Sequence, residues 1–272
     1  MKDRSYGRFE QTRTDDEVGR YAEEISVRGF TTIPNVFSSE ELAEWRKKID
    51  LVYAEQEAAY GRDALIAIQE LDVARAPLLY DMSFIKLATQ PLILSVVKKF
   101  LGDFFILNLQ NAIINRPNET HHQSSWHRDL PYQNWVISRP LAINALLAID
   151  EFSEMTGGTR VVPFSHKMEI LPSDAYIAGN NVVATATAGS AIVFDAMLFH
   201  RAGVNKSQTV RRAVNHLYTT PILKQQYDFP RALGDRPDLS PEIARLLGYT
   251  SQVAVDDRAW RRARTARGGG SK

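Results

Sequence analysis

The sequence contains no cysteine, which excludes disulfides, thiolate metal sites and cysteine nucleophiles together. Any metal site must therefore use nitrogen and oxygen ligands. Charge of one sign is also not in excess, because 33 lysines and arginines against 32 aspartates and glutamates leave a net charge of +1. That balance gives no electrostatic argument for a nucleic acid or an acidic membrane surface as a partner, and neither is predicted. The first eleven residues lack the apolar segment of a signal peptide, and no apolar run approaches the length of a membrane span. These absences predict a soluble, cytoplasmic protein.

The composition that remains is ordinary for a folded protein. Hydrophobic residues make up 44% and charged residues 24% of the 272 residues, which argues against wholesale disorder. The chain is long enough for one large domain with a sizeable core, and it shows no internal repeat. We therefore expect a single domain over residues 1–272, with a basic and disordered tail over residues 258–272.

The first hundred residues favour helices. Capping-box patterns at residues 14–17 and 38–41 each precede an apolar stripe with helical spacing, and the first stripe stops near Gly29. Pro91 can open a third helix, which should end at Gly102. Between the first two helices, residues 30–34 fit a short strand. Because the helices precede the strands, we expect them to pack against one outer face of a β structure.

From residue 103 onward the pattern changes to strands. Short apolar or alternating segments separated by Gly, Pro and Ser are found at residues 105–114, 141–150, 159–163, 181–186, 189–195 and 211–220. Several short strands in succession are typical of a sandwich or barrel rather than of βαβ units. A further helix is expected over residues 240–247. The predicted class is mainly β with flanking helices, which is an α+β arrangement.

The stretch Trp126-His127-Arg128-Asp129 is the strongest candidate for a functional site. His127 and Asp129 alternate with Arg128, so on an extended segment they project to the same side. With a second imidazole they would form the facial 2-His-1-carboxylate set of non-haem Fe(II) oxygenases, which leaves three coordination positions open. His200, which follows a predicted strand, is the best candidate for this second imidazole. A His-x-Asp pair alone carries little weight, because most histidines are surface or structural residues.

The segment that begins at His200 supports the assignment of these residues to a metal site. Asn205, Lys206 and Ser207 follow the distal histidine, and Arg211 lies eleven residues past it. In these residues, together with the His-x-Asp pair, the chain resembles the phytanoyl-CoA dioxygenase family of Fe(II)/2-oxoglutarate-dependent oxygenases. The resemblance covers residues 20 to 225, including the Gly-Gly and Pro-x-Ser-His segments between residues 141 and 167. It implies a double-stranded β-helix, the jelly-roll core of cupin-like enzymes.

The resemblance also implies roles for four residues. His127, Asp129 and His200 would bind Fe(II), and Arg211 would pair with the distal carboxylate of the co-substrate 2-oxoglutarate. Arginine suits that task because its planar fork meets a carboxylate with two parallel charge-assisted bonds. Neighbours on a strand face opposite sides, so only one of Arg211 and Arg212 can enter the barrel. The family spacing selects Arg211, whereas the residues alone leave the choice even.

Two side-chain amides are candidates for contacting the metal-binding end of 2-oxoglutarate, Gln110 as the stronger candidate and Asn144 as the weaker one. For Gln110 an equally good interpretation is a structural role, in which its amide forms a hydrogen bond with a backbone group at the edge of a strand. Relatives often carry Ser or Thr two residues past the distal histidine, where this chain has Ala202, so that contact must come from elsewhere. Strand alternation places His216 opposite Arg211, which argues against His216 as a ligand.

Together these features predict a dioxygenase that uses O2 and 2-oxoglutarate to oxidise a small molecule, with hydroxylation as the main expectation and succinate as the co-product. Halogenases of the family lack the acidic ligand, so Asp129 argues against halogenation. Two alternatives remain: a cupin-type metalloenzyme, such as an isomerase, that does not use 2-oxoglutarate, and an inactive jelly-roll binding domain. Arg211 argues against both, because neither requires a buried arginine at that spacing. The substrate contacts would come from loops, so the sequence does not identify the substrate.

Overall fold

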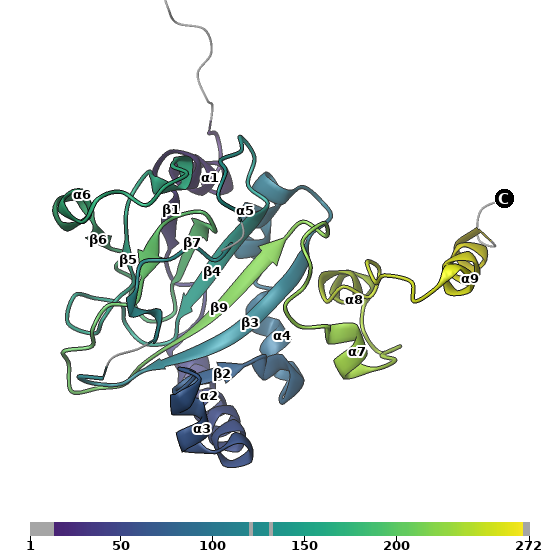
Figure 1. Ribbon diagram of the computed structural model, residues 1–272, viewed down its shortest axis with the longest axis horizontal. Coiled ribbons are helices and arrows are strands. Elements are labelled where there is room, and N and C mark those ends of the chain that lie inside the picture. Colours follow the sequence, from purple (N-terminus) through teal and green to yellow (C-terminus); the bar gives the residue numbers. More distant parts are fainter. Residues whose placement is uncertain (1–13, 120–121, 131–132, 269–272) are drawn as a thin grey trace, which may run out of the picture.

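Two antiparallel sheets form the centre of the computed structural model, which describes residues 14–119, 122–130 and 133–268 (Figure 1). The larger sheet has six strands in the order β1-β7-β4-β9-β3-β2, and the smaller has three in the order β6-β5-β8. The strands are β1 (Phe30–Ile33), β2 (Val73–Arg75), β3 (Ile106–Asn115), β4 (Ala142–Ala148), β5 (Arg160–Val161), β6 (Val182–Val183), β7 (Ala191–Asp195), β8 (His200–Arg201) and β9 (Arg211–Thr219).

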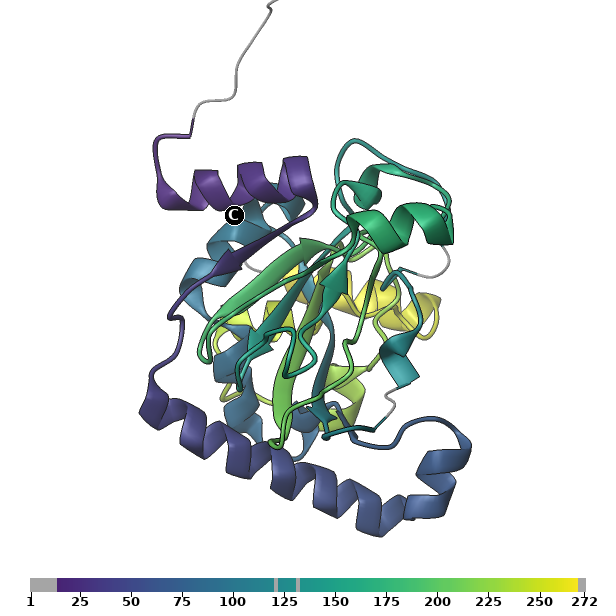
Figure 2. The ribbon, with the colours of Figure 1, turned by 90° about the vertical axis from the view of Figure 1, so that its left-hand side faces the viewer.

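The described helices are α1 (Glu17–Arg28), α2 (Ser39–Tyr60), α3 (Arg62–Ala67), α4 (Ile85–Ala88), α5 (Pro91–Leu101), α6 (Asp174–Asn180), α7 (Phe229–Leu233), α8 (Pro241–Leu246) and α9 (Asp257–Gly268). Helices α2, α4 and α5 pack against the outer face of the larger sheet. Figure 2 shows α1 and the long α2 running along two edges of the β structure. None of the described helices is both long and apolar enough to cross a membrane.

Two apolar clusters hold these layers together. The larger one joins the helices to the outer face of the six-stranded sheet and includes Ile49, Phe84 and Leu147. The smaller one lies between the two sheets and includes Val161 from β5 and Ala213 from β9. Burial of this apolar surface stabilises both interfaces, at about 25 cal/mol per Å². The cleft between the sheets is lined partly by the smaller cluster and is the place where the polar residues described below converge.

Strand β9 shows how the two faces of the larger sheet differ. Ala213 belongs to the cluster between the sheets, whereas Val214 belongs to the cluster under the helices. Because side chains alternate along a strand, Arg211 and Asn215 face the cleft, and His216 faces the helices. The pairing of β9 with β3 and β4 fixes this register on both sides.

The predicted α+β class with a double-stranded β-helix core is confirmed, with two corrections, one at the start of α1 and one in the C-terminal tail. The capping box at Ser38 is present as expected, but the N-cap of α1 is Asp16 rather than Thr14. The prediction of a disordered tail over 258–272 was wrong for most of its length, because α9 continues to Gly268. Figure 1 shows α9 projecting from the body of the protein. Residues 269–272 lie outside the described part of the chain.

Candidate metal centre and co-substrate pocket

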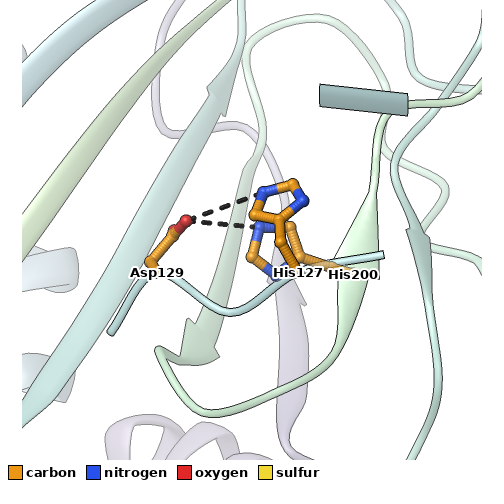
Figure 3. A group of neighbouring side chains, drawn as sticks. All are labelled: His127, Asp129 and His200. Atoms are coloured by element: carbon orange, nitrogen blue, oxygen red, sulfur yellow. Dashed lines mark ion pairs between the residues drawn. The ribbon is translucent and has the colours of Figure 1, made fainter. Parts of the chain in front are cut away.

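His127, Asp129 and His200 come together in the cleft between the sheets, as the sequence predicted (Figure 3). His127 pairs with His200 of β8 through two reciprocal backbone hydrogen bonds, each 3.0 Å long. Two residues further on, the N–H of Asp129 donates to the carbonyl of Ala196 at 3.1 Å. Backbone hydrogen bonds therefore hold the segment of His127 and Asp129 against the segment that carries His200.

Both imidazoles are oriented in the same way. The Nδ1 atom of His127 lies 2.8 Å from the carbonyl oxygen of Ser125, and that of His200 lies 2.9 Å from the carbonyl oxygen of Leu198. In each ring Nδ1 must carry the hydrogen that donates to the carbonyl, so Nε2 keeps a free lone pair. The two Nε2 atoms lie 3.8 Å and 3.6 Å from Oδ1 of Asp129.

This geometry fits a shared metal ion. Two ligand atoms that each lie about 2.1 Å from one ion can be at most about 4.2 Å apart, and both imidazole–carboxylate separations meet that limit. The second carboxylate oxygen, Oδ2 of Asp129, is buried without a hydrogen-bond partner. Burial lowers the pKa of His200, which keeps its ring neutral and ready to ligate near pH 7. Two nitrogens and one hard oxygen suit Fe(II) with open coordination positions.

Arg211 lies in the same pocket, at the start of β9. Its side chain is buried, with a residue exposure of 3%, and it packs with its guanidinium carbon 4.3 Å from the ring centre of Phe152. The Nε atom is buried without an acceptor, and within the described residues no carboxylate forms an ion pair with it. Burial lowers the pKa of Arg211 to about 10, and the group stays cationic at neutral pH. A buried cation without a counter-charge is costly unless a ligand supplies the charge.

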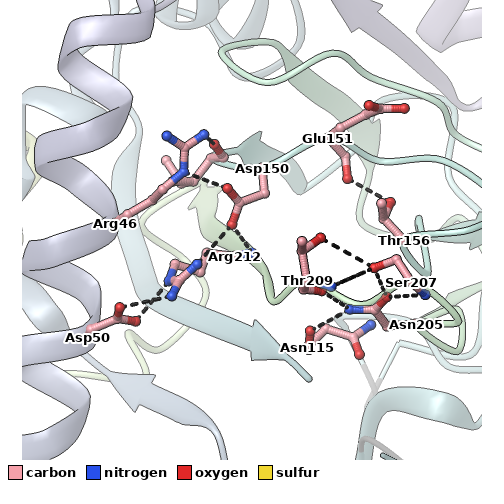
Figure 4. Close-up of polar contacts among 11 residues, drawn as sticks. Arg46, Asp50, Asn115, Asp150, Glu151, Thr156, Asn205, Ser207, Thr209 and Arg212 are labelled. Atoms are coloured by element: carbon pink, nitrogen blue, oxygen red, sulfur yellow. Dashed lines mark hydrogen bonds and ion pairs between the residues drawn. The ribbon is translucent and has the colours of Figure 1, made fainter. Parts of the chain in front are cut away.

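Arg212 faces the outer side of the sheet, as alternation with Arg211 predicts. Figure 4 shows its side chain beside Asp50 and Asp150. Its Nε and Nη2 atoms donate to the two carboxylate oxygens of Asp50 in α2, at 2.8 Å and 2.9 Å. Its backbone N–H donates to Asp150 at 2.8 Å, and its Nη1 lies 3.3 Å from the same carboxylate oxygen. Arg212 therefore ties the outer face of the sheet to α2.

Asn205 fixes the loop between the distal histidine and Arg211 (Figure 4). Its amide nitrogen donates to the carbonyls of Asn115 and Thr209, at 2.9 Å and 2.8 Å. Its amide oxygen accepts from the backbone N–H and the hydroxyl of Ser207. The side chain is fully buried. This network gives a physical reason for an Asn-Lys-Ser segment at this point, because it sets the path of the chain from β8 to β9.

Several buried polar atoms in and beside the pocket have no partner. They include both amide atoms of Asn144 and the amide oxygen of Asn215, in addition to the atoms of Asp129 and Arg211 named above. Asn215 lines the pocket itself, and Asn144 is on the same face of β4 as the pocket residue Leu146. Buried polar groups in native proteins are normally hydrogen-bonded, so several orphans around one cavity indicate a polar guest. A guest with two carboxylates would match a metal at one end and Arg211 at the other.

The predicted contact between Gln110 and 2-oxoglutarate is contradicted by the hydrogen bonds that Gln110 forms. Its Oε1 accepts from the N–H of Leu78 at 3.1 Å, and its Nε2 donates to the carbonyl of Phe84 at 3.0 Å. The same Nε2 lies 2.9 Å from Nε2 of His216. Ile113 of β3 lines the pocket, so Gln110, three residues earlier, faces the helices. Its amide is fully used on that side, which corresponds to the structural alternative.

His216 also faces the helices, as predicted, and burial lowers its pKa to about 3. It is therefore a neutral core residue at all ordinary pH values. Sequence reasoning missed Asn215 and Thr159, which both line the pocket. The signal for Asn215 was available, because the alternation that turned His216 outward also turns Asn215 inward. Ala202 lines the pocket without a polar group, and these two residues supply polar side chains close by.

The comparisons with known proteins agree with this arrangement. The family model of phytanoyl-CoA dioxygenase (PhyH) matches residues 26–213, which is more than half of the chain. The chain belongs to the phytanoyl-CoA dioxygenase family. An uncharacterized protein of Mycobacterium tuberculosis, Rv1501, is 36% identical over 242 residues, covering 85% of this chain and 87% of that protein. The dioxygenase olcK of Penicillium canescens is 32% identical over 162 residues, covering 56% of this chain and 52% of that protein.

Solved structures share the fold. EctD from S. alaskensis, with 2-oxoglutarate and 5-hydroxyectoine, has a TM-score of 0.64 at 20% identity and covers 78% of this chain and 79% of that chain. The α-ketoglutarate-dependent epimerase SnoN of nogalamycin biosynthesis has a TM-score of 0.57 at 20% identity, covering 75% and 83%. As a member of the phytanoyl-CoA dioxygenase family with a His-Asp-His cluster, the protein is a non-haem Fe(II)/2-oxoglutarate-dependent oxygenase with a double-stranded β-helix.

Proposed function

We propose that this member of the phytanoyl-CoA dioxygenase family oxidises a small organic molecule, with hydroxylation as the expected outcome. His127, Asp129 and His200 hold Fe(II), and Arg211 holds the distal carboxylate of 2-oxoglutarate. The chemistry supplied by that bound pair is O2 activation, coupled to decarboxylation of 2-oxoglutarate to succinate. The relatives olcK and EctD are named as a dioxygenase and as a protein solved with 2-oxoglutarate, which supports the proposal by analogy.

The observation that carries the proposal is the buried, unpaired guanidinium of Arg211 in the same pocket as the His-Asp-His cluster. A planar carboxylate is the partner that a guanidinium fork fits best, through two parallel bonds. Burial of Arg211 strengthens those bonds, because the local dielectric constant is lower than in water. Co-substrate binding would also relieve the desolvation cost that Arg211 carries when alone.

The remaining groups orient the guest. Asn215 and Thr159 line the pocket, and Asn144 lies beside it on the same face of β4 as Leu146, so these side chains offer polar groups to a ligand. The carbonyls of Ser125 and Leu198 orient both imidazole rings, so that each Nε2 faces the place where the metal would bind. Loading then requires only a small approach of Asp129 and the two rings toward the ion.

Two rivals make different demands on Arg211. An isomerase or other cupin-type metalloenzyme would use the three ligands without a second carboxylate site, so a buried cation in the pocket would have no task. An inactive binding domain would need neither an intact metal cluster nor two imidazoles held in a ligating orientation. Both rivals leave the partnerless buried atoms without an explanation.

The test is a substrate screen that reads succinate. The Fe(II)-loaded protein is incubated with 2-oxoglutarate and O2, alone and with members of a small-molecule library, and succinate and oxidised product are quantified together. The proposal predicts a slow background of succinate, and a rise with the right compound in which product and succinate form one to one. Complete absence of succinate under all conditions, with 2-oxoglutarate unbound, would favour the rivals.

A further inference from the structure

A second cavity adjoins the metal pocket. It has a volume of about 240 Å³ and shares Arg201 and Ala202 with the pocket that contains His200. Its lining comes mainly from two segments that are far apart in the sequence, residues 154–160 and residues 201–206. A molecule bound in this cavity lies next to the metal pocket, and Ala202 at the boundary has only a methyl group.

Glycines bring two of the lining segments into close contact. A Cβ atom on Gly157 would lie 2.6 Å from the carbonyl oxygen of Gly203, and a Cβ on Gly203 would lie 2.5 Å from that of Gly158. Gly157 also has a φ of +71°, which disfavours other residues. Only glycine therefore allows this approach, and the contact fixes the relative position of residues 157–158 and 203.

The cavity carries an excess of positive charge. Arg160, Arg201 and Lys206 line it together with a single acid, Glu154. Glu154 is already engaged, because Nη2 of Arg160 donates to it, while Nη1 of Arg160 donates to Asn181 at 2.6 Å. In the part of the chain that is described, neither Arg201 nor Lys206 forms an ion pair. Two cations are left without a counter-charge.

The surroundings of Arg201 restrain its side chain and leave its charge without a partner among the described residues. Arg201 lies directly opposite Arg160 in the β5–β8 pairing, where like charges repel, and Glu154 forms an ion pair with Arg160 rather than with Arg201. Its guanidinium carbon lies 4.9 Å from the ring centre of Trp126, which restrains the side chain. Its Nε atom is buried and has no acceptor. A buried donor of a charged group without an acceptor is costly, and an oxyanion would remove that cost.

We propose that this cavity binds an oxyanion group of the primary substrate, either a carboxylate or a phosphate. Arg201 provides paired hydrogen bonds to the planar or tetrahedral oxyanion, and Lys206 adds a second charge from the rim. The proposal rests on the proposed function, because it places the substrate beside the metal pocket. It restricts the substrate class to small molecules that carry an acidic group within reach of the oxidised carbon.

The test uses three aromatic probes of similar size: benzoate, phenyl phosphate and the neutral benzamide. Each is titrated calorimetrically into the anaerobic Fe(II)·2-oxoglutarate complex, so that Arg211 is already occupied. We expect at least one anion to bind at least about tenfold more tightly than benzamide. The tighter of the two anions identifies the group as carboxylate or phosphate.

Variants decide whether Arg201 is responsible. Arg201→Gln should weaken anion binding about tenfold, Arg201→Lys should restore part of it, and Lys206→Gln should have a smaller effect. Arg231→Gln, an exposed arginine in α7, is the matched control and should bind like wild type. The Fe(II)·2-oxoglutarate complex should have a visible charge-transfer absorption band. This visible band, recorded on each sample, shows that the variant is folded and has bound Fe(II) and 2-oxoglutarate.

Three results would overturn the inference: benzamide binds as tightly as both anions, neither anion binds, or Arg201→Gln binds the anions as wild type does. Each is meaningful only while the visible band is present. Loss of the band in the wild-type protein is instead a failure of the proposed function. The two failures are therefore distinguishable in one set of samples.

Discussion

Replacing Arg211 by lysine keeps the positive charge and changes its shape, which makes Arg211→Lys a sharp probe of co-substrate binding. A guanidinium fork can make two parallel bonds to the distal carboxylate of 2-oxoglutarate, whereas an ammonium group is a single point donor. Losing one charge-assisted bond in a buried site costs about 1.5–3 kcal/mol. The expected loss of 2-oxoglutarate affinity is therefore about ten- to a hundredfold.

Burial adds a pH dependence to this loss. The site already lowers the pKa of Arg211 to about 10. An ordinary lysine has a lower pKa than arginine, and the same burial would lower the pKa of a lysine at position 211 further in the absence of ligand. Once the pH exceeds that pKa, binding of the carboxylate must also take up a proton. The affinity of Arg211→Lys should thus fall further between pH 7 and 8.5, while that of the wild type should not.

The assay is isothermal titration of 2-oxoglutarate into protein loaded with Fe(II), without O2, at both pH values. Arg212→Lys is the matched control, because its side chain pairs with Asp50 on the outer face. It should bind 2-oxoglutarate like wild type, and Fe(II) affinity should be unchanged in both variants. A larger loss in Arg212→Lys than in Arg211→Lys would refute the reasoning, and so would full affinity in both.

Three further predictions concern buried polar groups. Burial raises the pKa of Asp195 to about 6 from an ordinary 3.8, so between these values the folded state holds a proton that the unfolded state has released, and stability falls as pH rises from about 4 to about 6. Asp195→Asn should therefore be more stable than wild type by about 3 kcal/mol at pH 8 in urea unfolding, with a smaller gain near pH 4. Tyr218 donates to the carbonyl of Ala88 at 2.8 Å, so Tyr218→Phe should lower the free energy of unfolding by about 1 kcal/mol without changing 2-oxoglutarate affinity. Asn144→Leu should leave the ligand-free protein at least as stable, because both amide atoms lack partners, and should weaken 2-oxoglutarate binding about tenfold in the same titration; unchanged affinity would remove Asn144 from the site.

The elements of this fold were predictable where local signals were strong. Ser38 and Glu41 form a capping box that the sequence shows directly, and Pro91 marks the first turn of α5. Alternation along one strand required Arg211 and Arg212 to face opposite sides, and the spacing from His200 that the family shares selected Arg211 as the inward one. These features depend on residues close together in the chain, and their physical basis is local.

Gln110 shows the limit of such reasoning. Its residue type and its strand led to the prediction of a co-substrate contact, but its side chain faces Leu78 and Phe84 under the helices. Which face of β3 turns inward is set by its pairing with β9 and by a register shift between Leu107 and Leu109. Pairing across the sheet is a long-range property, and the sequence of a single strand does not contain it.

The tail was misjudged for a different reason. Its high positive charge suggested disorder, yet alanine and arginine are among the better helix formers. The start signal was also present, because the carboxylate of Asp256 accepts from the N–H of Ala259 at the first turn of α9. Local helix propensity outweighed charge repulsion at this point of the chain.

The central claim is that His127, Asp129 and His200 hold an iron ion on which 2-oxoglutarate chelates. It is tested most directly by the visible charge-transfer absorption of the anaerobic protein after addition of Fe(II) and then 2-oxoglutarate. The wild type should develop the band only when both are present. Asp129→Ala and His200→Ala should each abolish it while far-ultraviolet circular dichroism stays native, because each removes one ligand from an intact fold. If both variants kept the full band, the assignment of the metal ligands would be wrong.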